Sequence, residues 1–157
     1  MTIKKSKSLY LMIAVILIAG IAALAQSPNG NVTPEGAWNV AVAFDRPGLP
    51  PCAPAPSVVI ATTPNRGTVI ADSCWASESA GYGVWTRTGH NQFAITFKGN
   101  SFAPDETVAV SYTVKASVSM DASANAFAGP FQTQLFDLAG NVVDTLTGRV
   151  KAVRIEP

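Results

Sequence analysis

Residues 108–120 read VAVSYTVKASVSM, and this stretch decides the fold. Larger, mostly apolar side chains at the even positions alternate with Ala, Ser, Thr and Lys at the odd positions. A period of two indicates a β-strand with one face toward the core, because the repeat of a helix is 3.6 residues. We therefore expect one long strand here and search for partners on both sides of it.

Seven further segments carry strand signals separated by turn sequences. Downstream, DASAN at residues 121–125 predicts a turn into a strand over residues 127–137, and AGN at residues 139–141 predicts a turn into a last strand over residues 142–155. Upstream, the predicted strands lie at residues 37–44, around Val58 and Ile60, and at residues 68–72, 82–87 and 93–98. The breaks between them include RPGLPP at residues 46–51, PNRG at residues 64–67 and TGHN at residues 88–91.

These segments predict an all-β domain: an eight-stranded antiparallel up-and-down barrel. The connections are short and no helical pattern lies between the strands, which favours sequential neighbours in one sheet. An open sheet would expose two edges, and closure into a barrel removes them. Eight strands leave an interior that side chains fill or that holds one small ligand. A two-sheet sandwich is the alternative fold.

The N-terminus has the pattern of a targeting signal. Lysines at positions 4, 5 and 7 precede an uninterrupted apolar run over residues 9–25, which ends in Ala-Leu-Ala. A basic region, a hydrophobic region and a small-x-small cleavage site stand here in the order of a signal peptide. An uncleaved anchor helix is the alternative, because the run is just long enough to span a bilayer. In both cases the domain is expected outside the cytoplasm, secreted or periplasmic.

The predicted organisation follows from this boundary. We assign residues 1–25 to the signal peptide or N-terminal membrane anchor, residues 26–35 to a linker or an ordered lead-in to the first strand, and residues 36–157 to the barrel. Three of the 11 Lys and Arg residues precede the apolar run, which leaves 8 basic against 10 acidic residues and a net charge of −2. This balance gives no reason to expect nucleic acid as a partner, and we expect a monomer.

A short motif and one arginine, far apart in the sequence, resemble features of a known protein family. Gly36-Ala37-Trp38, at the start of the first strand, resembles the G-x-W motif of lipocalins, and Arg154 stands where those proteins place a basic side chain over the Trp. In a closed meander the first and last strands are antiparallel neighbours, so Arg154 is expected beside Trp38. A guanidinium over an indole contributes on the order of 1 kcal/mol or more when partly desolvated.

A second segment resembles small exported bacterial proteins of lipocalin-like, calycin type. It reads GYGVWTRTG at residues 81–89 and FAITF at residues 93–97. Residues 121–125 carry no second lipocalin motif, and the second to fourth predicted strands are short. These departures from the lipocalin pattern argue against the deep cup of a transport lipocalin.

The apolar faces predict an interior that binds a small hydrophobic molecule without catalysis. The residues expected to line it are Trp38, Val40, Val42, Phe44, Phe93, Phe97, Tyr112, Leu135 and Arg154, and Val58, Ile60, Ile95, Val108, Val110 and Val114 share their strand faces. Two alternatives stay open. A structural or interaction module of the cell envelope would have a filled interior. A barrel enzyme resembling the cyclases of oxylipin metabolism would need polar groups inside, and the sequence offers few beyond Tyr112 and Arg154.

No pattern predicts a catalytic residue, a cofactor or a metal site. His90 is the only histidine and falls in a predicted hairpin turn, where a solvated loop residue is the expected role. Four carboxylates, Asp72, Glu78, Asp105 and Glu106, fall in loops at one end of the barrel. They either ring its mouth or are solvated loop charges.

Aromatic residues outside this set have two interpretations. Trp75, Trp85, Phe102 and Tyr82 either line a pocket or pack in the barrel core. Trp85 has the opposite parity to Tyr82 and Val84, so one of these sets faces outward. An outward Trp85 would indicate a contact surface.

Cys52 and Cys74 are the only cysteines. An even count in an exported domain favours a disulfide. Cys52 follows the first predicted strand and Cys74 the third, and because strand direction alternates, both loops emerge at the same end. We predict a bond that ties the proline-rich loop at residues 47–56 to the loop containing Trp75. Two buried free thiols are the alternative.

Overall fold

The computed structural model describes residues 32–156, except for the side chains of residues 53, 54, 56, 58, 60 and 61. The predicted signal or anchor segment at residues 1–25 and most of the linker at residues 26–35 lie outside the described residues. Within the described range there is no helix with the length and hydropathy needed to cross a membrane.

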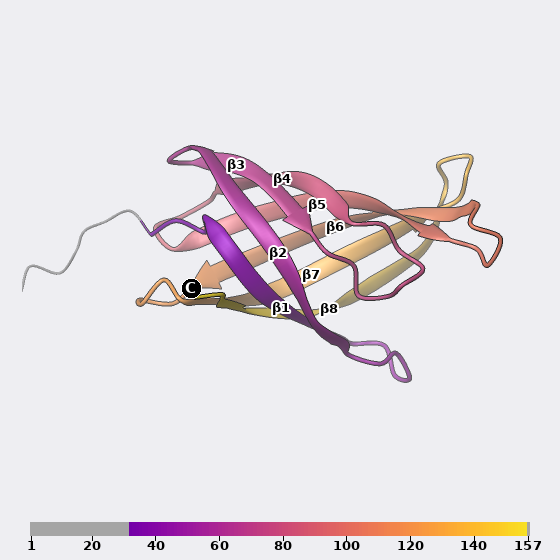
Figure 1. Cartoon of the computed structure of the whole chain (residues 1–157), viewed down its shortest axis with the longest axis horizontal. Helices are drawn as coiled ribbons and strands as arrows, with labels where there is room; N and C mark the ends of the chain where they lie inside the picture. The colour runs from indigo at the N-terminus through magenta and orange to yellow at the C-terminus, as the bar shows by residue number, and fades with distance from the viewer. Residues whose placement is uncertain (1–31, 157) are drawn as a thin grey trace, which may run out of the picture. The chain divides into compact units, whose positions relative to one another are not determined.

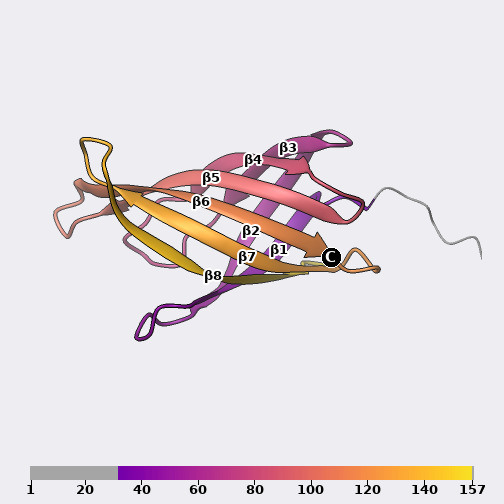
Figure 2. The same cartoon turned by 180° about the vertical axis from the view of Figure 1, so that it is seen from behind.

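Eight antiparallel strands form one closed barrel (Figures 1 and 2). The strands are β1 (Gly36–Phe44), β2 (Cys52–Thr63), β3 (Arg66–Ala71), β4 (Gly81–Arg87), β5 (Gln92–Phe102), β6 (Val108–Met120), β7 (Ala126–Phe136) and β8 (Val142–Arg154). Each strand pairs with the next, and β1 pairs with β8 to close the sheet. The predicted up-and-down barrel is confirmed, and β6 covers residues 108–120 as its alternation predicts.

The second strand begins earlier than predicted. The expected proline-rich loop over residues 47–56 ends at Pro51, because β2 already begins at Cys52. Pairing explains how a strand tolerates these prolines. β3 ends at Ala71, opposite Ser57, so the first residues of β2 have a neighbouring strand, β1, on one side only. A proline is acceptable at such an edge, where its missing N–H breaks no ladder bond.

The inward face follows the register of the pairs. Trp38 lies opposite Ser57 on β2 and opposite Arg154 on β8, which places these three positions on one face. On β2, Cys52 is buried at the start of the strand, and the other buried residues among those described are the odd-numbered Ala55, Ser57 and Val59. Val58 and Ile60 are also predicted to face the interior, but their side chains are among those that the structure does not describe.

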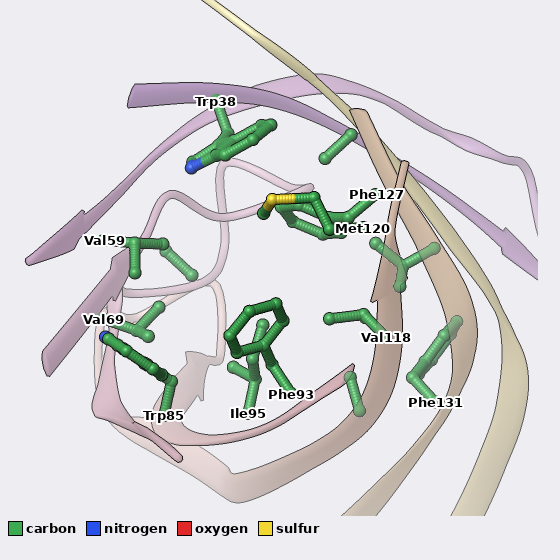
Figure 3. Close-up of a cluster of buried hydrophobic side chains, with 14 residues drawn as sticks. Trp38, Val59, Val69, Trp85, Phe93, Ile95, Val118, Met120, Phe127 and Phe131 are labelled. Atoms are coloured by element: carbon green, nitrogen blue, oxygen red, sulfur yellow. The ribbon is translucent and has the colours of Figure 1, made fainter. Parts of the chain in front are cut away.

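Buried side chains from all eight strands form one cluster inside the barrel (Figure 3). Trp85 is 1% exposed and contacts Phe93 edge-on, with 5.7 Å between the ring centroids. Tyr82 and Val84, of the opposite parity, are 65% and 57% exposed. Of the two alternating sets on β4, Trp85 therefore faces the core, and Tyr82 and Val84 face outward.

Trp38 closes the end of the barrel at which β1 begins, and its side chain is 0% exposed. The Arg154 guanidinium carbon lies 4.3 Å from the centroid of the Trp38 ring, and the Phe127 ring is 4.8 Å away on another side. The indole Nε1 donates to the carbonyl oxygen of Pro34 at 2.8 Å. The predicted contact between Arg154 and Trp38 is present, and the last residues before β1 form an ordered lead-in that packs into the barrel.

The hydrogen bonds of Arg154 explain the glycine of the G-x-W stretch. Arg154 donates from Nε and Nη2 to the carbonyl of Ala124 and from Nη1 to the carbonyl of Glu35. Gly36 has φ of 134°, and a Cβ at this position would collide with the Arg154 guanidinium. Only glycine adopts this backbone conformation without strain and leaves room for the arginine.

Two aspartates build the last two hairpin turns. The Asp121 carboxylate accepts hydrogen bonds from the Ser123 hydroxyl and the Asn125 backbone N–H, and Asp137 accepts from the backbone and side-chain amides of Asn141. These donors hold the pKa of both carboxyl groups below the usual range. Both turns lie where the sequence predicts them, for the reason that Asp favours turns: its side chain pairs with backbone groups two or more residues on.

Candidate ligand-binding cavity

The interior is hollow above the closed end. A cavity of about 250 Å³, partly open to solvent, extends from Trp38 to the β3–β4 loop. Its wall is formed mainly by Val, Ala, Phe and Leu side chains from the inward faces of the strands. The polar side chains that reach it are Ser57, Asp72, Ser73, Glu78, Ser101, Tyr112 and Thr133.

Most of the residues predicted to line an interior site do so. The structure brings together around this cavity Trp38, Val40, Val42, Phe44, Phe97, Tyr112 and Leu135. Phe93 and Arg154 do not line it. Phe93 is buried in the core beside Trp85, and Arg154 packs on the side of Trp38 at the closed end. That any of these residues binds a ligand stays a prediction.

Glycines in β4 set the position of Phe97 in the wall. Gly81 and Gly83 lie on the inward face of β4, because they alternate with the outward-facing Tyr82 and Val84. Having no side chains, the two glycines leave space on that face. A Cβ at Gly81 would collide with the Phe97 ring, and one at Gly83 with the backbone of β5 at Thr96 and Phe97. The G-Y-G stretch at residues 81–83 therefore lets β5 and the Phe97 ring approach β4 closely.

The disulfide predicted from the sequence is present at the mouth. Cys52 and Cys74 are bonded, with 5.1 Å between their Cα atoms. The bond attaches the β3–β4 loop to the first residue of β2. This loop is also hydrogen-bonded to the end of β5, from the Ser79 N–H to the carbonyl of Asn100 at 2.8 Å and from the Phe102 N–H to the carbonyl of Ser77 at 2.7 Å. The loop is thus anchored on two sides.

This anchored loop contributes Trp75 and Glu78 to the cavity wall, besides Asp72, Ser73 and the disulfide-bonded Cys74. The Trp75 ring stacks on Phe44, with 5.6 Å between centroids and 19° between planes. Phe44 in turn contacts Phe131 edge-on at 5.5 Å. Three aromatic rings from β1, β7 and the loop therefore form one continuous wall near the mouth.

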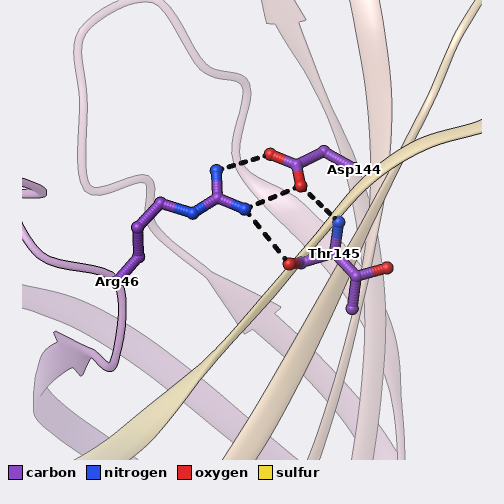
Figure 4. A network of polar contacts seen from close by, with 3 residues as sticks. All are labelled: Arg46, Asp144 and Thr145. Carbon is purple, nitrogen blue, oxygen red and sulfur yellow. Dashed lines mark hydrogen bonds and ion pairs between the residues drawn. The ribbon is translucent and has the colours of Figure 1, made fainter.

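A second link at the same end joins the β1–β2 loop to β8 (Figure 4). Arg46 donates from Nη1 and Nη2 to the two carboxylate oxygens of Asp144, at 2.6 and 2.7 Å. The bond to Arg46, with help from the Thr145 N–H, lowers the pKa of the Asp144 carboxyl to about 2. Both side chains are substantially exposed, so this pair orders the loop more than it stabilises the fold.

Tyr112 and Glu78 are the ionisable groups set deepest in the wall. The Tyr112 hydroxyl donates to the carbonyl oxygen of Ser79 at 3.0 Å. Burial, together with the nearby Glu78 carboxylate, raises the pKa of Tyr112 to about 12. Burial also raises the pKa of Glu78, although a backbone hydrogen bond from Cys74 acts in the opposite direction.

The four carboxylates predicted at one end divide into two pairs. Asp72 and Glu78 line the cavity, as a ring of mouth carboxylates would, whereas Asp105 and Glu106 lie exposed in the β5–β6 loop. Asp105 accepts hydrogen bonds from Thr107 and serves that turn. His90 is exposed in its turn, and the described part of the chain contains no cluster of His, Cys, Asp and Glu able to hold a metal.

Sequence reasoning missed several lining residues, including Ser57, Val59, Thr133 and Leu146. Thr133 shares strand parity with Leu135, which was correctly predicted, and Leu146 shares parity with Arg154 on β8, so extending the alternation along both strands could have found them. Ser57 and Val59 are different, because β2 alternates weakly and its inward face is decided by pairing with β1 and β3.

Comparisons with known proteins support the fold. No protein-family model and no curated protein matches the sequence. Among solved structures, that of EF1p2_mFAP2b bound to DFHBI is similar, with a TM-score of 0.52 and 14% sequence identity over 83% of this chain and 100% of that chain. The similarity between the two proteins is therefore a similarity of fold.

The raised pKa of Tyr112 predicts a loss of stability in alkali. A folded-state value of about 12 against an ordinary 10 means that the unfolded chain releases the phenol proton first as pH rises. The stabilisation is complete below pH 10 and is lost as pH rises to about 12. The urea midpoint of the native protein should therefore fall more steeply across this window than that of Tyr112→Phe. Parallel curves for the two proteins would show that Tyr112 is not protected from ionisation.

Proposed function

We propose that this protein is an exported, non-catalytic β-barrel that binds one small apolar molecule in its cavity. The main observation behind this proposal is the hollow apolar interior of about 250 Å³. It is partly open at the end where the disulfide joins β2 to the β3–β4 loop. Protein interiors are normally packed without space of this size, so a barrel that served only as a structural plug would be expected to be filled. Ligand sites are mainly apolar hollows with a few placed polar groups, which is the composition of this wall.

The volume sets the size of the molecule. Taking about 30 Å³ for each heavy atom, as for water in the liquid, the cavity of about 250 Å³ has room for roughly eight of them. The mouth leaves a polar end of the molecule in reach of solvent. An aliphatic chain with one polar head group has the matching shape.

Two further observations support the proposal. The similar barrel is bound to DFHBI, so a related architecture holds a ligand in at least one case. The Cys52–Cys74 bond agrees with export, because disulfides persist in oxidising compartments and are rare in the cytoplasm. A targeting segment at residues 1–25 and kinship with lipocalin-like exported proteins are part of the same proposal.

A second candidate function is that of an interaction module of the cell envelope. The observation in its favour is an exposed apolar area on the outer wall of β3 and β4. Ile70 pairs with Tyr82 across the two strands, and both are exposed together with Val84. The hollow interior has no role in this alternative, which is why we place ligand binding first.

Filling the cavity tests the proposed function. Val114 lines the cavity and its neighbour Lys115 is exposed on the opposite face of β6, so Val114→Phe and Lys115→Phe form a matched pair. Isothermal titration with octanol should show one saturable site in the native protein and in Lys115→Phe. Val114→Phe should weaken binding about tenfold or more, since the added ring occupies the space of the ligand. Equal affinity in all three proteins would place octanol outside the barrel.

A further inference from the structure

Among the residues that the structure describes, the cavity wall carries acidic but no basic groups. The ionisable side chains that line it are Asp72, Glu78 and Tyr112, and no Lys, Arg or His of residues 32–156 lines it. A carboxylate or phosphate head group at the mouth would therefore meet no counter-charge. This composition is the reverse of a site built for fatty acids.

The charge imbalance extends to the whole open end of the barrel. Seven of the ten acidic residues lie in the loops or strand ends there: Asp45, Asp72, Glu78, Asp105, Glu106, Asp137 and Asp144. Arg46 is the basic residue in the same loops, and it is already paired with Asp144. The other basic residues of the described chain lie along the strands or at the closed end. Such a field raises the local concentration of cations and repels anions.

Glu78 is the acidic residue best placed to meet a ligand. Its side chain is half-buried at the cavity wall, and among the described residues no basic side chain forms an ion pair with it. Its backbone is anchored by a bridge to Ser101 on β5 and by the N–H bond to the carbonyl of Trp75. A carboxylate held in a largely apolar hollow without a counter-ion is costly, and a bound cation would offset that cost.

The surroundings of Glu78 suit a cation as well. The Trp75 ring, stacked on Phe44, and the Tyr112 ring line the same cavity. The faces of aromatic rings attract ammonium groups through their negative quadrupole. Carboxylate and aromatic faces together form the environment in which proteins hold amines.

We propose that the cavity binds a cationic amphiphile, with the apolar body inside the barrel and a protonated amine at Glu78. This inference rests on the proposed function and adds the chemical class of the ligand. Burial that raises the pKa of the Glu78 carboxyl agrees with it, because an ammonium beside the group would stabilise the charged form. The ligand thus completes an ion pair that the free protein lacks.

Three probes with one tail and different heads test the inference on the full exported domain. Octylammonium, octanol and octanoate are titrated by calorimetry at neutral pH and low salt. Octylammonium should bind about tenfold more tightly than octanol, and octanoate more weakly than octanol. Added salt should weaken octylammonium binding and leave octanol binding nearly unchanged.

Two isosteric variants locate the effect. Glu78→Gln should reduce the preference for octylammonium over octanol to near unity while octanol still binds, which also shows that the cavity is intact. Glu106→Gln removes one charge from the same end outside the cavity wall and should keep most of the preference. A thermal melt of Glu78→Gln no lower than that of the native protein is expected, because the variant removes a half-buried unpaired charge.

The outcomes separate the two proposals. Octanoate binding as tightly as octylammonium, or a preference unchanged in Glu78→Gln, would overturn the assignment of a cationic ligand and leave the apolar-ligand function standing. Absence of binding by all three probes would overturn both.

Discussion

Replacing Trp38 with alanine should lower the free energy of unfolding by about 3–5 kcal/mol, the range for a fully buried aromatic residue. The side chain is 0% exposed and closes one end of the barrel. Its loss removes the contacts with Phe127 and Arg154 and leaves the Pro34 carbonyl without its donor. Because β1 and β8 meet at this point, the closing seam of the sheet loses its main packing contact.

The measurement is urea denaturation of the oxidised protein, followed by circular dichroism. Tyr82→Ala is the matched control, since it removes an aromatic ring of comparable size from the outer wall, where the side chain is 65% exposed. We expect a change of less than about 1 kcal/mol for this control. Equal changes in the two variants would mean that the Trp38 cluster does not stabilise the closed barrel.

Removing the disulfide should cost about 3 kcal/mol. Cys52 and Cys74 are 22 residues apart, and the chain-entropy estimate for a loop of this length gives that value. For a domain of this size the melting temperature should fall by about 10 °C on reduction or in the double variant Cys52→Ala/Cys74→Ala. The cause is mainly the greater freedom of the unfolded chain.

Thiol labelling provides the control for this prediction. The native, unreduced protein should react with no thiol reagent, and reduction should expose two reactive groups. The two single variants Cys52→Ala and Cys74→Ala should lose about as much stability as the double variant, because either one opens the loop. Labelling of both cysteines without reduction would refute the bond, and a double variant as stable as the native protein would refute its energetic role.

The barrel itself was accessible from local patterns. The alternation over residues 108–120 fixes both the type of element and its inward face, because neighbouring side chains of a strand point to opposite sides. A sequential meander of eight such strands has a closing pair, and from that pair the contact between Trp38 and Arg154 follows. The alternating direction of the strands likewise brings Cys52 and Cys74 to one end.

The candidate site was accessible in part. Residues on strongly alternating strands, such as Phe44 and Tyr112, were placed in the wall correctly. Phe93 has the same inward parity but lies lower in the barrel, against Trp85, where the interior is filled. Parity gives the face of a strand, and height along the barrel axis is decided by the register between strands.

The sequence by itself determined the number, direction and strongest faces of the strands, because these depend on the period of side chains along one segment. Only the tertiary structure decided the inward face of β2, the height of each side chain in the barrel and the presence of a hollow. β2 alternates too weakly to set its own register, so pairing with β1 and β3 sets it. A cavity is the difference between the volume enclosed by the whole sheet and the summed volume of the side chains inside it. Glu78 faces that cavity because the β3–β4 loop is held by a disulfide and by β5, two constraints that no short stretch of sequence contains.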